Sequence, residues 1–208
     1  MKPKLSILIP TIVGREEMFN DLLLSIKRQY VYKQHKKTKS SDGRVTTFTY
    51  FLDGLEIIYC IDNREMKVGE KRNKLIELAT GKYVSMVDDD DKVSEDYIEQ
   101  LLAGIESGAD IITFDVSVSI DGATPKPCYY SMYFDGDKNE PDAYYRLPNH
   151  LMCVKREIAL QVPFKEINFG EDADYAVRLK PLLKSEHSIN KVLYHYDYNS
   201  KTTATQRR

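Results

Sequence analysis

Residues Tyr83 to Asp91 read Tyr-Val-Ser-Met-Val-Asp-Asp-Asp-Asp, a short apolar run that ends in four acidic residues. An almost continuous apolar run of this length is typical of a strand buried on both faces of a sheet. Such strands build parallel sheets, whose ligands bind at the carboxyl ends of the strands. The stretch therefore predicts a ligand site at Asp88–Asp91.

Similar apolar runs recur along the chain and alternate with helical patterns. We expect strands at 5–9, 55–61, 83–87 and 111–114 and a last strand at 191–196. Apolar residues that recur every three to four positions predict helices at 18–30, at 69–79 and between Ser94 and Gly108, the last with Ile98, Leu101, Leu102 and Ile105 on its apolar face. Two further helices are expected near 156–160 and at 171–183. Strands that alternate with helices predict an α/β fold with a doubly wound, mostly parallel sheet.

Local signals mark the ends of some of these helices. The residues Met18, Leu22, Ile26 and Tyr30 define one apolar face of the first helix. Gly81 is the expected residue just past the end of the second helix. Ser94 suits the N-cap of the third helix, because its side chain can accept a hydrogen bond from a free backbone N–H.

Three segments fall outside this alternation. The stretch from Lys33 to Arg44 is basic and predicts a flexible loop. Residues 122–148 are rich in Tyr, Pro and Asp, which indicates a small antiparallel or irregular portion. The tail at 201–208 is polar and is expected to be loose. We therefore predict one domain over residues 1–200, with a nucleotide-binding half at 1–115 and an acceptor half at 116–200.

Composition excludes several other classes of protein. The 208 residues include 30 Lys+Arg and 32 Asp+Glu, for a formal net charge of −2. This near balance argues against a dedicated polyanion binder, which carries a basic excess. The three cysteines lie far apart and fit neither a disulfide scaffold nor a zinc knuckle. No run of about 20 apolar residues predicts a membrane span, so we expect a soluble, cytoplasmic protein whose oligomeric state is open.

The acidic quartet is the strongest chemical signal. Four adjacent carboxylates repel one another, and a position above a buried sheet makes their ionisation harder. A divalent cation such as Mg²⁺ or Mn²⁺ would relieve this repulsion, since it takes oxygen ligands from carboxylates and phosphates. The alternative is a solvated acidic turn that caps the following helix.

Two further acidic positions have both a functional and a structural interpretation. Asp62 ends the second strand, where it could hydrogen-bond a base or ribose or simply form a turn with Asn63. Glu171, Asp172 and Asp174 open a helix, where acids usually complement the helix dipole. A carboxylate there could also act as a general base toward a hydroxyl.

In order and spacing, these segments resemble the family 2 glycosyltransferases. The resemblance spans about residues 4–200 and includes an opening strand, an Arg-Asn helix, a DxD-like quartet, a Glu-Asp segment and a closing Tyr-x-Tyr strand. The matching residues are Lys4–Thr11, Glu56–Asp62, Gly69–Asn73, Ala79–Val84, Val87–Asp91, Phe164, Glu171–Asp172, Arg178–Leu179 and Tyr194–Tyr196. Asp89 departs from the family pattern, because a small residue usually stands between the two acids of the motif.

The resemblance implies a GT-A fold, a nucleoside-diphosphate sugar donor such as a UDP-sugar, and Mn²⁺ or Mg²⁺. It places Pro10, Thr11 and Asp62 around the base and ribose, with Arg72 in support and Arg15 at the donor phosphate. It assigns the metal to Asp90 and Asp88, with Asp89 beside them and His195 as a weaker candidate ligand. Asp172 would be the catalytic base, with Glu171 next to it.

The predicted activity is metal-dependent, inverting transfer of a sugar to an acceptor hydroxyl. The acceptor stays open among a glycan, a lipid-linked glycan and a modified nucleic acid, which the basic stretch 33–44 could contact. The tyrosines at 129, 130, 133, 144 and 145 could stack on a sugar or only pack together, and His150 could border the acceptor site. A nucleotidyltransferase and a non-catalytic nucleotide-sugar-binding module are the alternatives.

Overall fold

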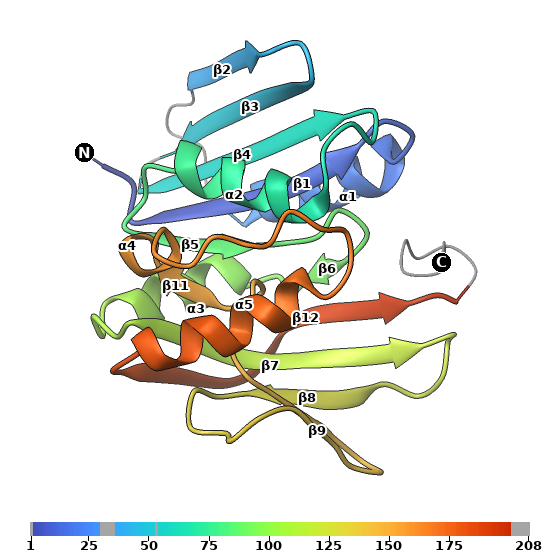
Figure 1. Cartoon of the computed structure of the whole chain (residues 1–208), viewed down its shortest axis with the longest axis vertical. Coiled ribbons are helices and arrows are strands. Elements are labelled where there is room, and N and C mark those ends of the chain that lie inside the picture. Colours follow the sequence, from blue (N-terminus) through green and yellow to red (C-terminus); the bar gives the residue numbers. More distant parts are fainter. Residues whose placement is uncertain (1, 30–35, 53, 201–208) are drawn as a thin grey trace.

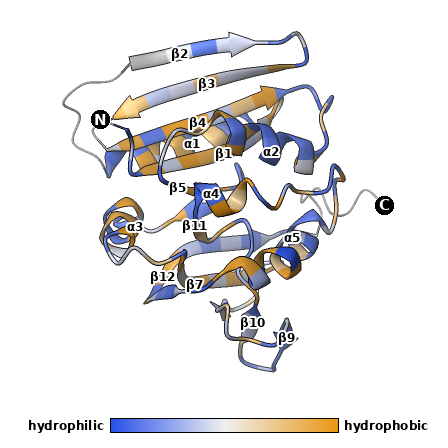
Figure 2. Ribbon diagram, turned by 60° about the vertical axis from the view of Figure 1, so that its left-hand side comes forward, coloured by the Kyte–Doolittle hydropathy of each residue, from blue (hydrophilic) through white to orange (hydrophobic). Residues whose placement is uncertain are grey.

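The centre of the fold is a set of parallel strands whose residues are buried on both faces. In the computed structural model, which describes residues 2–29, 36–52 and 54–200, β1 (Leu5–Ile12) pairs in parallel with β4 (Leu55–Asp62). On its other side β1 pairs in parallel with β5 (Tyr83–Met86). The apolar side chains of these strands are buried, and the colouring of Figure 2 shows that much of β1 and β4 is hydrophobic. The carboxyl ends of three neighbouring strands therefore meet at one edge.

The remaining strands extend this sheet in both directions (Figure 1). Its order is β2-β3-β4-β1-β5-β11-β7-β8-β10-β9, with β12 paired to β7 in parallel and to β6 in antiparallel orientation. The bounds are β2 (Lys36–Ser41), β3 (Val45–Leu52), β6 (Lys92–Val93), β7 (Ile111–Ile120), β8 (Lys126–Tyr130), β9 (Lys138–Asn139), β10 (Tyr144–Arg146), β11 (Cys153–Lys155) and β12 (Glu186–Tyr198).

Helices cover both faces of the sheet, which confirms the predicted α/β, doubly wound class. Helices α1 (Glu16–Arg28) and α3 (Tyr97–Ile105) lie on one face, and α2 (Val68–Leu78) and α5 (Glu171–Leu179) lie on the other (Figures 1 and 2). The short helix α4 (Arg156–Ala159) follows β11, and the 3₁₀ helix η1 (Lys180–Leu182) follows α5. Within the described ranges, no helix combines the length and the apolar character that crossing a bilayer requires.

The prediction of a flexible basic loop at 33–44 is wrong for its described part. Residues from Lys36 onward form β2, which pairs in antiparallel register with β3, and β3 pairs in the same way with β4. The hairpin turns at Gly43, whose φ of 90° is open to glycine without strain. The β-branched and aromatic residues of β3 favour a strand. The polar sequence of β2 does not by itself predict a strand, but pairing with β3 stabilises one there. Lys33 lies outside the described residues.

Several predicted helix ends differ from the structure. Met18 is 48% exposed, and the buried face of α1 is formed by Phe19, Leu22, Leu23 and Ile26. The N-cap of α3 is Asp96 rather than Ser94, whose hydroxyl donates to the Asp96 carboxylate over 3.0 Å. The predicted helix at 171–183 ends earlier, because the 3₁₀ turn η1 with its Pro181 follows Leu179.

Gly81 does not terminate a helix; it allows the start of β5 to lie close to β1. A Cβ at this position would lie 2.8 Å from the backbone nitrogen of Ser6 and 2.9 Å from the carbonyl carbon of Leu5. Its φ is outside the left-handed region that a helix-terminating glycine adopts. A side chain is therefore excluded because β5 must begin directly beside β1.

The C-terminal half adds the expected antiparallel portion. β8 is antiparallel to β7, and β9 is antiparallel to β10, whereas β10 runs parallel to β8. β7 crosses the expected boundary at residue 115, so the two halves share one sheet. The closing strand β12 is longer than predicted and runs beside β7 from Glu186 to Tyr198. The predicted loose tail at 201–208 lies outside the described residues.

Candidate functional site

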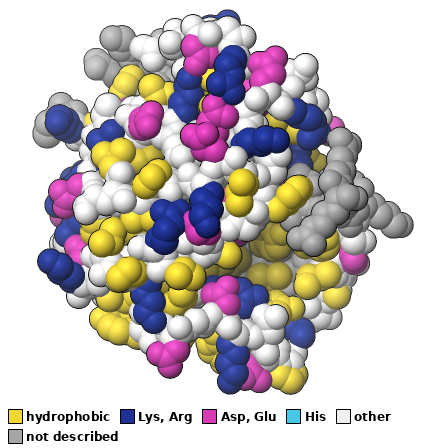
Figure 3. Space-filling model, viewed as in Figure 1, with side chains coloured by type: hydrophobic (Ala, Val, Ile, Leu, Met, Phe, Trp, Pro, Cys, Tyr) yellow, Lys and Arg dark blue, Asp and Glu magenta, His cyan; other side chains and the backbone are white. Residues whose placement is uncertain are grey.

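A cavity of about 590 Å³ opens where β1 and β5 end. Its wall contains Pro10 and Thr11 from β1, the acidic turn Asp88–Asp91 after β5, and Asp172 from the first turn of α5. The hollow lies to the right of the centre in Figure 3, where hydrophobic side chains form part of its wall. The structure thus brings the strand-end acids and the helix-opening acids, more than 80 positions apart, to one cavity.

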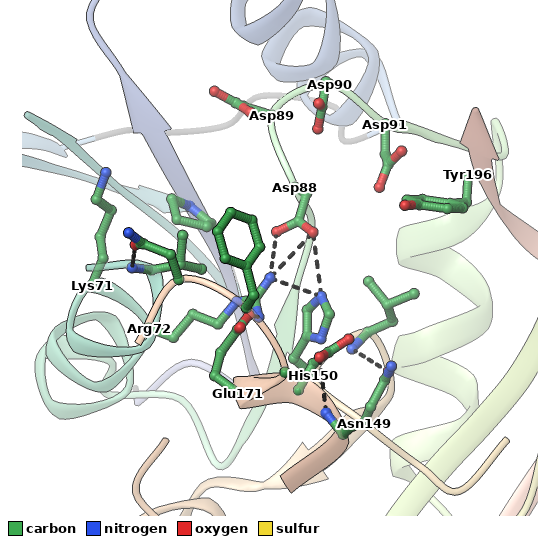
Figure 4. A pocket seen from close by; sticks show the side chains of 18 of the residues that line it. Lys71, Arg72, Asp88, Asp89, Asp90, Asp91, Asn149, His150, Glu171 and Tyr196 are labelled. Carbon is green, nitrogen blue, oxygen red and sulfur yellow. Dashed lines mark hydrogen bonds and ion pairs between the residues drawn. The ribbon is translucent and has the colours of Figure 1, made fainter. Parts of the chain in front are cut away.

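Asp88 is held by two basic side chains. Nη2 of Arg72 lies 3.0 Å from Oδ1 and 3.2 Å from Oδ2 of Asp88, and Nε2 of His150 lies 3.3 Å from Oδ2 (Figure 4). Burial alone would raise the pKa of Asp88, but Arg72 and His150 outweigh it and hold the pKa far below its usual value. The carboxylate of Asp88 is therefore ionised and already compensated by protein charges.

Arg72 also binds Glu171, so one guanidinium joins the two acidic segments of the site. Its Nη1 pairs with Oε1 of Glu171, and both side chains are almost completely buried. Burial raises the pKa of Glu171, although the charge of Arg72 opposes the shift. Glu171 is therefore a buried partner of Arg72, whereas the neighbouring Asp172 is only partly buried and lines the cavity.

His150 leaves one polar atom without a partner. Nη2 of Arg72 lies 3.0 Å from Nε2 of His150. The same Nε2 faces Oδ2 of Asp88, whereas Nδ1 on the other side of the ring is buried and has no hydrogen-bond partner in the described part of the chain. His150 lines the cavity beside Asn149 and Leu151, so it borders the site as the sequence suggested.

Asp89, the unusual acid inside the motif, is used to hold the turn. Thr11 Oγ1 donates to its Oδ2 over 2.7 Å, and Arg15 Nη1 donates to its Oδ1 over 2.6 Å. Arg15 also lies 3.2 Å from Oδ2 of Asp90. Burial raises the pKa of Asp89 despite Arg15 and Thr11. The acidic turn is thereby tied to the end of β1 and the start of α1.

Asp90 and Asp91 have a charge that the nearby protein groups compensate poorly. Burial raises the pKa of Asp90, and Asp88 and Asp89 add repulsion that Arg15 only partly offsets. The pKa of Asp91 is raised well above its usual value by burial and by Asp88. The hydroxyl of Tyr194 donates to Asp91 over 2.6 Å, and it accepts the backbone N–H of Asp88 over 3.1 Å.

Asp62 does not line the cavity, although it ends β4 as predicted. Its side chain is completely buried: Oδ1 pairs with Lys71, and Oδ2 accepts the backbone N–H of Met66 over 2.8 Å. Lys71 also donates to the carbonyl oxygen of Thr11 over 2.8 Å. Asp62 therefore joins β4, α2 and β1 beneath the cavity, whereas Pro10, Thr11, Arg15 and Arg72 reach its wall.

His195 is not brought to the acidic turn. It lies between Tyr194 and Tyr196 on β12, and side chains on a strand alternate between its two faces. Tyr194 contacts Asp91 and Tyr196 lines the cavity, so His195 points to the other face. The closing Tyr-x-Tyr pattern thus supplies two tyrosines to the site and no histidine.

The tyrosine-rich segment contributes unequally. Tyr130 lines the main cavity and also a second one of about 420 Å³, which Tyr144, Tyr196 and Tyr198 border. Tyr129 and Tyr145 pack against each other with ring centroids 5.6 Å apart, and Tyr133 is 71% exposed. Arg64 has no expected role at the site, and Tyr194 and Tyr196 were expected only as part of the closing strand. Alternation along the closing strand could have indicated the two tyrosines.

The donor set fits a divalent cation that is completed by ligand oxygens. The guanidinium groups of Arg15 and Arg72 face the carboxylates of Asp88–Asp91 and Glu171, so negative charge is in excess. Residues 2–29, 36–52 and 54–200 contain no group of three or more His, Cys, Asp or Glu side chains that could hold an ion alone. Mg²⁺ commonly binds one or two carboxylates and takes its other ligands from phosphates and water.

A doubly wound α/β sheet with carboxylates and a cavity at its strand ends is typical of proteins that bind their ligand at this edge of the sheet. The family model described as "Glycosyl transferase family 2" matches residues 6–159. The chain belongs to this family. The match ends before α5, so Glu171 and Asp172 lie outside it.

One curated relative and several solved structures are similar to this chain. The putative glycosyltransferase EpsH of Bacillus subtilis (strain 168) is 27% identical over 151 residues, which cover 65% of this chain and 43% of EpsH. The crystal structure of S. aureus TarS 1–349 has a TM-score of 0.63 at 16% identity, over 93% of this chain and 60% of TarS 1–349.

The same TarS fragment in complex with UDP has a TM-score of 0.64 at 14% identity, over 95% of this chain and 61% of the fragment. A complex of that fragment with UDP-GlcNAc is similar to the same degree, with a TM-score of 0.63. These likenesses confirm the expected GT-A fold. The chain spans less than half the length of EpsH and about three fifths of the TarS fragment.

Proposed function

We propose that this chain transfers a sugar from a UDP-sugar to an acceptor hydroxyl, with a divalent metal and with inversion at the anomeric carbon. The observation that supports this most strongly is the placement of Asp172 on the wall of the cavity that the acidic turn Asp88–Asp91 also lines. A sugar bound between these groups would have a general base on one side and its leaving group on the other.

The donor assignment is supported by the fold and by the relatives. A TarS fragment of the same fold forms complexes with UDP and with UDP-GlcNAc. In this chain Pro10, Thr11 and Arg15 lie on the wall between β1 and the acidic turn. We assign them to the nucleotide, with Asp62 in support beneath them.

The metal would be held by Asp90 together with Asp91, because their negative charge is the least compensated in the site. When bound, it would neutralise the charge that develops on the leaving diphosphate. Asp88 is a weaker candidate ligand, since Arg72 and His150 already engage it.

Asp172 would take the proton from the acceptor hydroxyl. The acceptor oxygen then attacks the anomeric carbon, and the bond between that carbon and the diphosphate breaks with its electron pair leaving on UDP. Asp172 suits this role because its carboxylate accepts a hydrogen bond from the N–H of Ala173 over 2.9 Å and is paired with no basic side chain in the described ranges. The start of α5 also stabilises its negative charge.

The test is a panel of nucleotide sugars with Mn²⁺, scored by thermal shift, by slow release of UDP, and by NMR of the released sugar. We expect a UDP-sugar to stabilise the protein and to be hydrolysed slowly, with the first-formed sugar in the inverted configuration. Pyrophosphate release from a nucleoside triphosphate would instead support a nucleotidyltransferase. Binding without any turnover would support a non-catalytic module.

A further inference from the structure

Arg64 combines three features that distinguish it on the cavity wall. It is exposed, it lies on the wall of the main cavity, and its backbone has a φ of 61°. The left-handed region is costly for any residue with a Cβ, and such residues cluster at ligand-binding sites. The chain therefore retains a strained conformation at the place where this side chain meets the cavity.

The other cations on the wall are already paired with carboxylates. Arg15 pairs with Asp89, Lys71 with Asp62, and Arg72 with Asp88 and Glu171, while Nε of Arg146 lies 3.8 Å from Asp137. Of the arginines and lysines that line the cavity in the described part of the chain, Arg64 is the one whose side chain forms neither an ion pair nor a hydrogen bond. A guanidinium has five N–H donors and no acceptor, so its ligand must supply acceptor oxygens or nitrogens.

The turn that presents Arg64 is built by Asp62. The Asp62 carboxylate accepts the N–H of Met66, and its backbone carbonyl accepts the N–H of Val13 over 2.9 Å. Both ends of the 62–66 segment are thereby fixed to the sheet. Because the Asp62 side chain is fully buried and occupied by Lys71 and Met66, it cannot face a ligand without breaking these contacts.

The position of Arg64 favours the base of a nucleotide over its phosphates. Arg64 follows β4, whereas the acidic turn follows β5, and β1 lies between these two strands. Two strand spacings separate the two loops by roughly 10 Å. The next wall residues along the chain, Met66 and Val68, are apolar and suit the flat face of a base.

We propose that Arg64 recognises the base of the donor nucleotide by donating to the carbonyl edge of a pyrimidine, and that Asp62 is a positioning residue for it. This inference rests on the proposed function, which supplies a nucleoside-diphosphate donor. Uracil presents carbonyl oxygens to such a donor group, while adenine has no carbonyl group.

The test measures the affinity of UDP, ADP and inorganic pyrophosphate for the full chain with Mn²⁺ by calorimetry. The variants are Arg64→Gly and Arg64→Asn, since both residues adopt the left-handed backbone readily. We expect wild type to prefer UDP, and the variants to lose about tenfold to a hundredfold of UDP affinity, the range for a hydrogen bond to a charged group. The affinities for ADP and pyrophosphate should change less than twofold.

Two matched controls separate strain and charge from recognition. Asp121 is the other non-glycine residue with a left-handed backbone in the described ranges, at φ 51°, and it is not on the cavity wall. Asp121→Gly and Arg28→Ala, which removes an exposed guanidinium on α1, should leave UDP affinity unchanged. Arg64→Gly should also raise the melting temperature, because glycine removes the backbone strain.

Each other result overturns the inference in a distinguishable way. A UDP affinity within twofold of wild type in both Arg64 variants would remove Arg64 from the donor site. An equal loss of affinity for UDP, ADP and pyrophosphate in the Arg64 variants would assign Arg64 to the diphosphate. Equal affinities of the wild type for UDP and ADP would show that the site does not discriminate between the bases. If wild type binds no nucleoside diphosphate, the proposed function fails together with the inference.

Discussion

Nη2 of Arg72 lies 3.0 Å from Oδ1 of Asp88, and this contact joins helix α2 to the acidic turn after β5. The other arm of the same guanidinium holds Glu171, the first residue of α5. Arg72 thus fixes the position of the turn that we assign to the metal relative to the helix that presents Asp172. Arg72 is the side chain that joins these two acidic segments directly, although it need not touch the reacting atoms.

Replacing Arg72 should cost stability as well as activity. In Arg72→Met, Asp88 and Glu171 lose their shared partner inside a buried region, and breaking a buried pair costs about 3–5 kcal/mol. Urea unfolding checks this value. Lys74→Met, on the same helix but paired with the exposed Asp42, is the control and should have a small effect. A loss in Arg72→Met no larger than in the control would contradict the structural role.

Asp172→Asn should abolish most of the turnover and leave donor binding intact. An amide cannot accept the acceptor proton, and loss of a general base lowers rates by about a hundredfold or more. Steady-state kinetics and UDP calorimetry measure the two effects. Asp174→Asn is a matched control, because Asp174 lies on the same helix, pairs with Lys165 and Arg178, and is absent from the cavity wall. Unchanged turnover in Asp172→Asn would reject the assignment.

Asp91→Asn should stabilise the protein at neutral pH when a chelator is present. Burial raises the pKa of Asp91 well above its usual value, so the native state binds this proton more tightly than the unfolded chain does. Stability therefore falls as pH rises above about 4, the pKa of an unfolded Asp. The amide of Asp91→Asn does not ionise, so the variant does not lose stability in this way as pH rises. Its melting temperature at pH 7 should therefore exceed that of wild type.

Asp88→Asn should have the opposite effect in the same experiment. The pKa of Asp88 is held below its usual value by Arg72 and His150 although burial opposes them. This carboxylate thus adds stability above pH 4 and loses it as pH falls. Melting temperatures between pH 4 and 8 in EDTA test both signs. An Asp91→Asn protein that melts below wild type at pH 7 would show that the charge of Asp91 is compensated.

Mn²⁺ and UDP together should stabilise the wild type more than either alone. A ligand at 100 times its Kd adds about 2.7 kcal/mol, which raises the melting temperature of a chain this size by roughly 5–10 °C. Asp90→Asn should lose the part of the shift that depends on Mn²⁺. Asp135→Asn, an exposed acid away from the cavity, serves as the control. A full Mn²⁺-dependent shift in Asp90→Asn would exclude Asp90 as a ligand.

Gly69→Ala should destabilise the fold by pushing α2 away from the segment that leads to α5. A Cβ at Gly69 would lie 1.8 Å from the carbonyl oxygen of Lys165, which is backbone and cannot move aside as a side chain could. Overpacking of this kind costs about 1–3 kcal/mol or more. Gly136→Ala has open space around its Cβ and should melt like wild type. Equal stability of the two variants would contradict this close approach.

The sequence by itself predicted the α/β class and the site at the strand ends. A strand that is buried on both faces consists of consecutive apolar residues. For this reason β1, β4 and β5, and the acids that follow them, could be placed from the local sequence alone. The same reasoning missed β2, because a polar strand at a sheet edge is stabilised by its partner β3 rather than by its own side chains. It also placed the N-cap of α3 two residues early.

Only the tertiary structure decided which of the predicted acids face the cavity. Asp62 and Asp88 both end central strands, yet Asp62 is buried under Lys71 while Asp88 reaches the cavity wall beside Arg72. The charge state of a carboxylate depends on partners that lie far away in the sequence, such as Arg72 and Glu171, 99 positions apart. Spacing along the chain cannot specify these pairs, because the sheet and its helices set the distances between them.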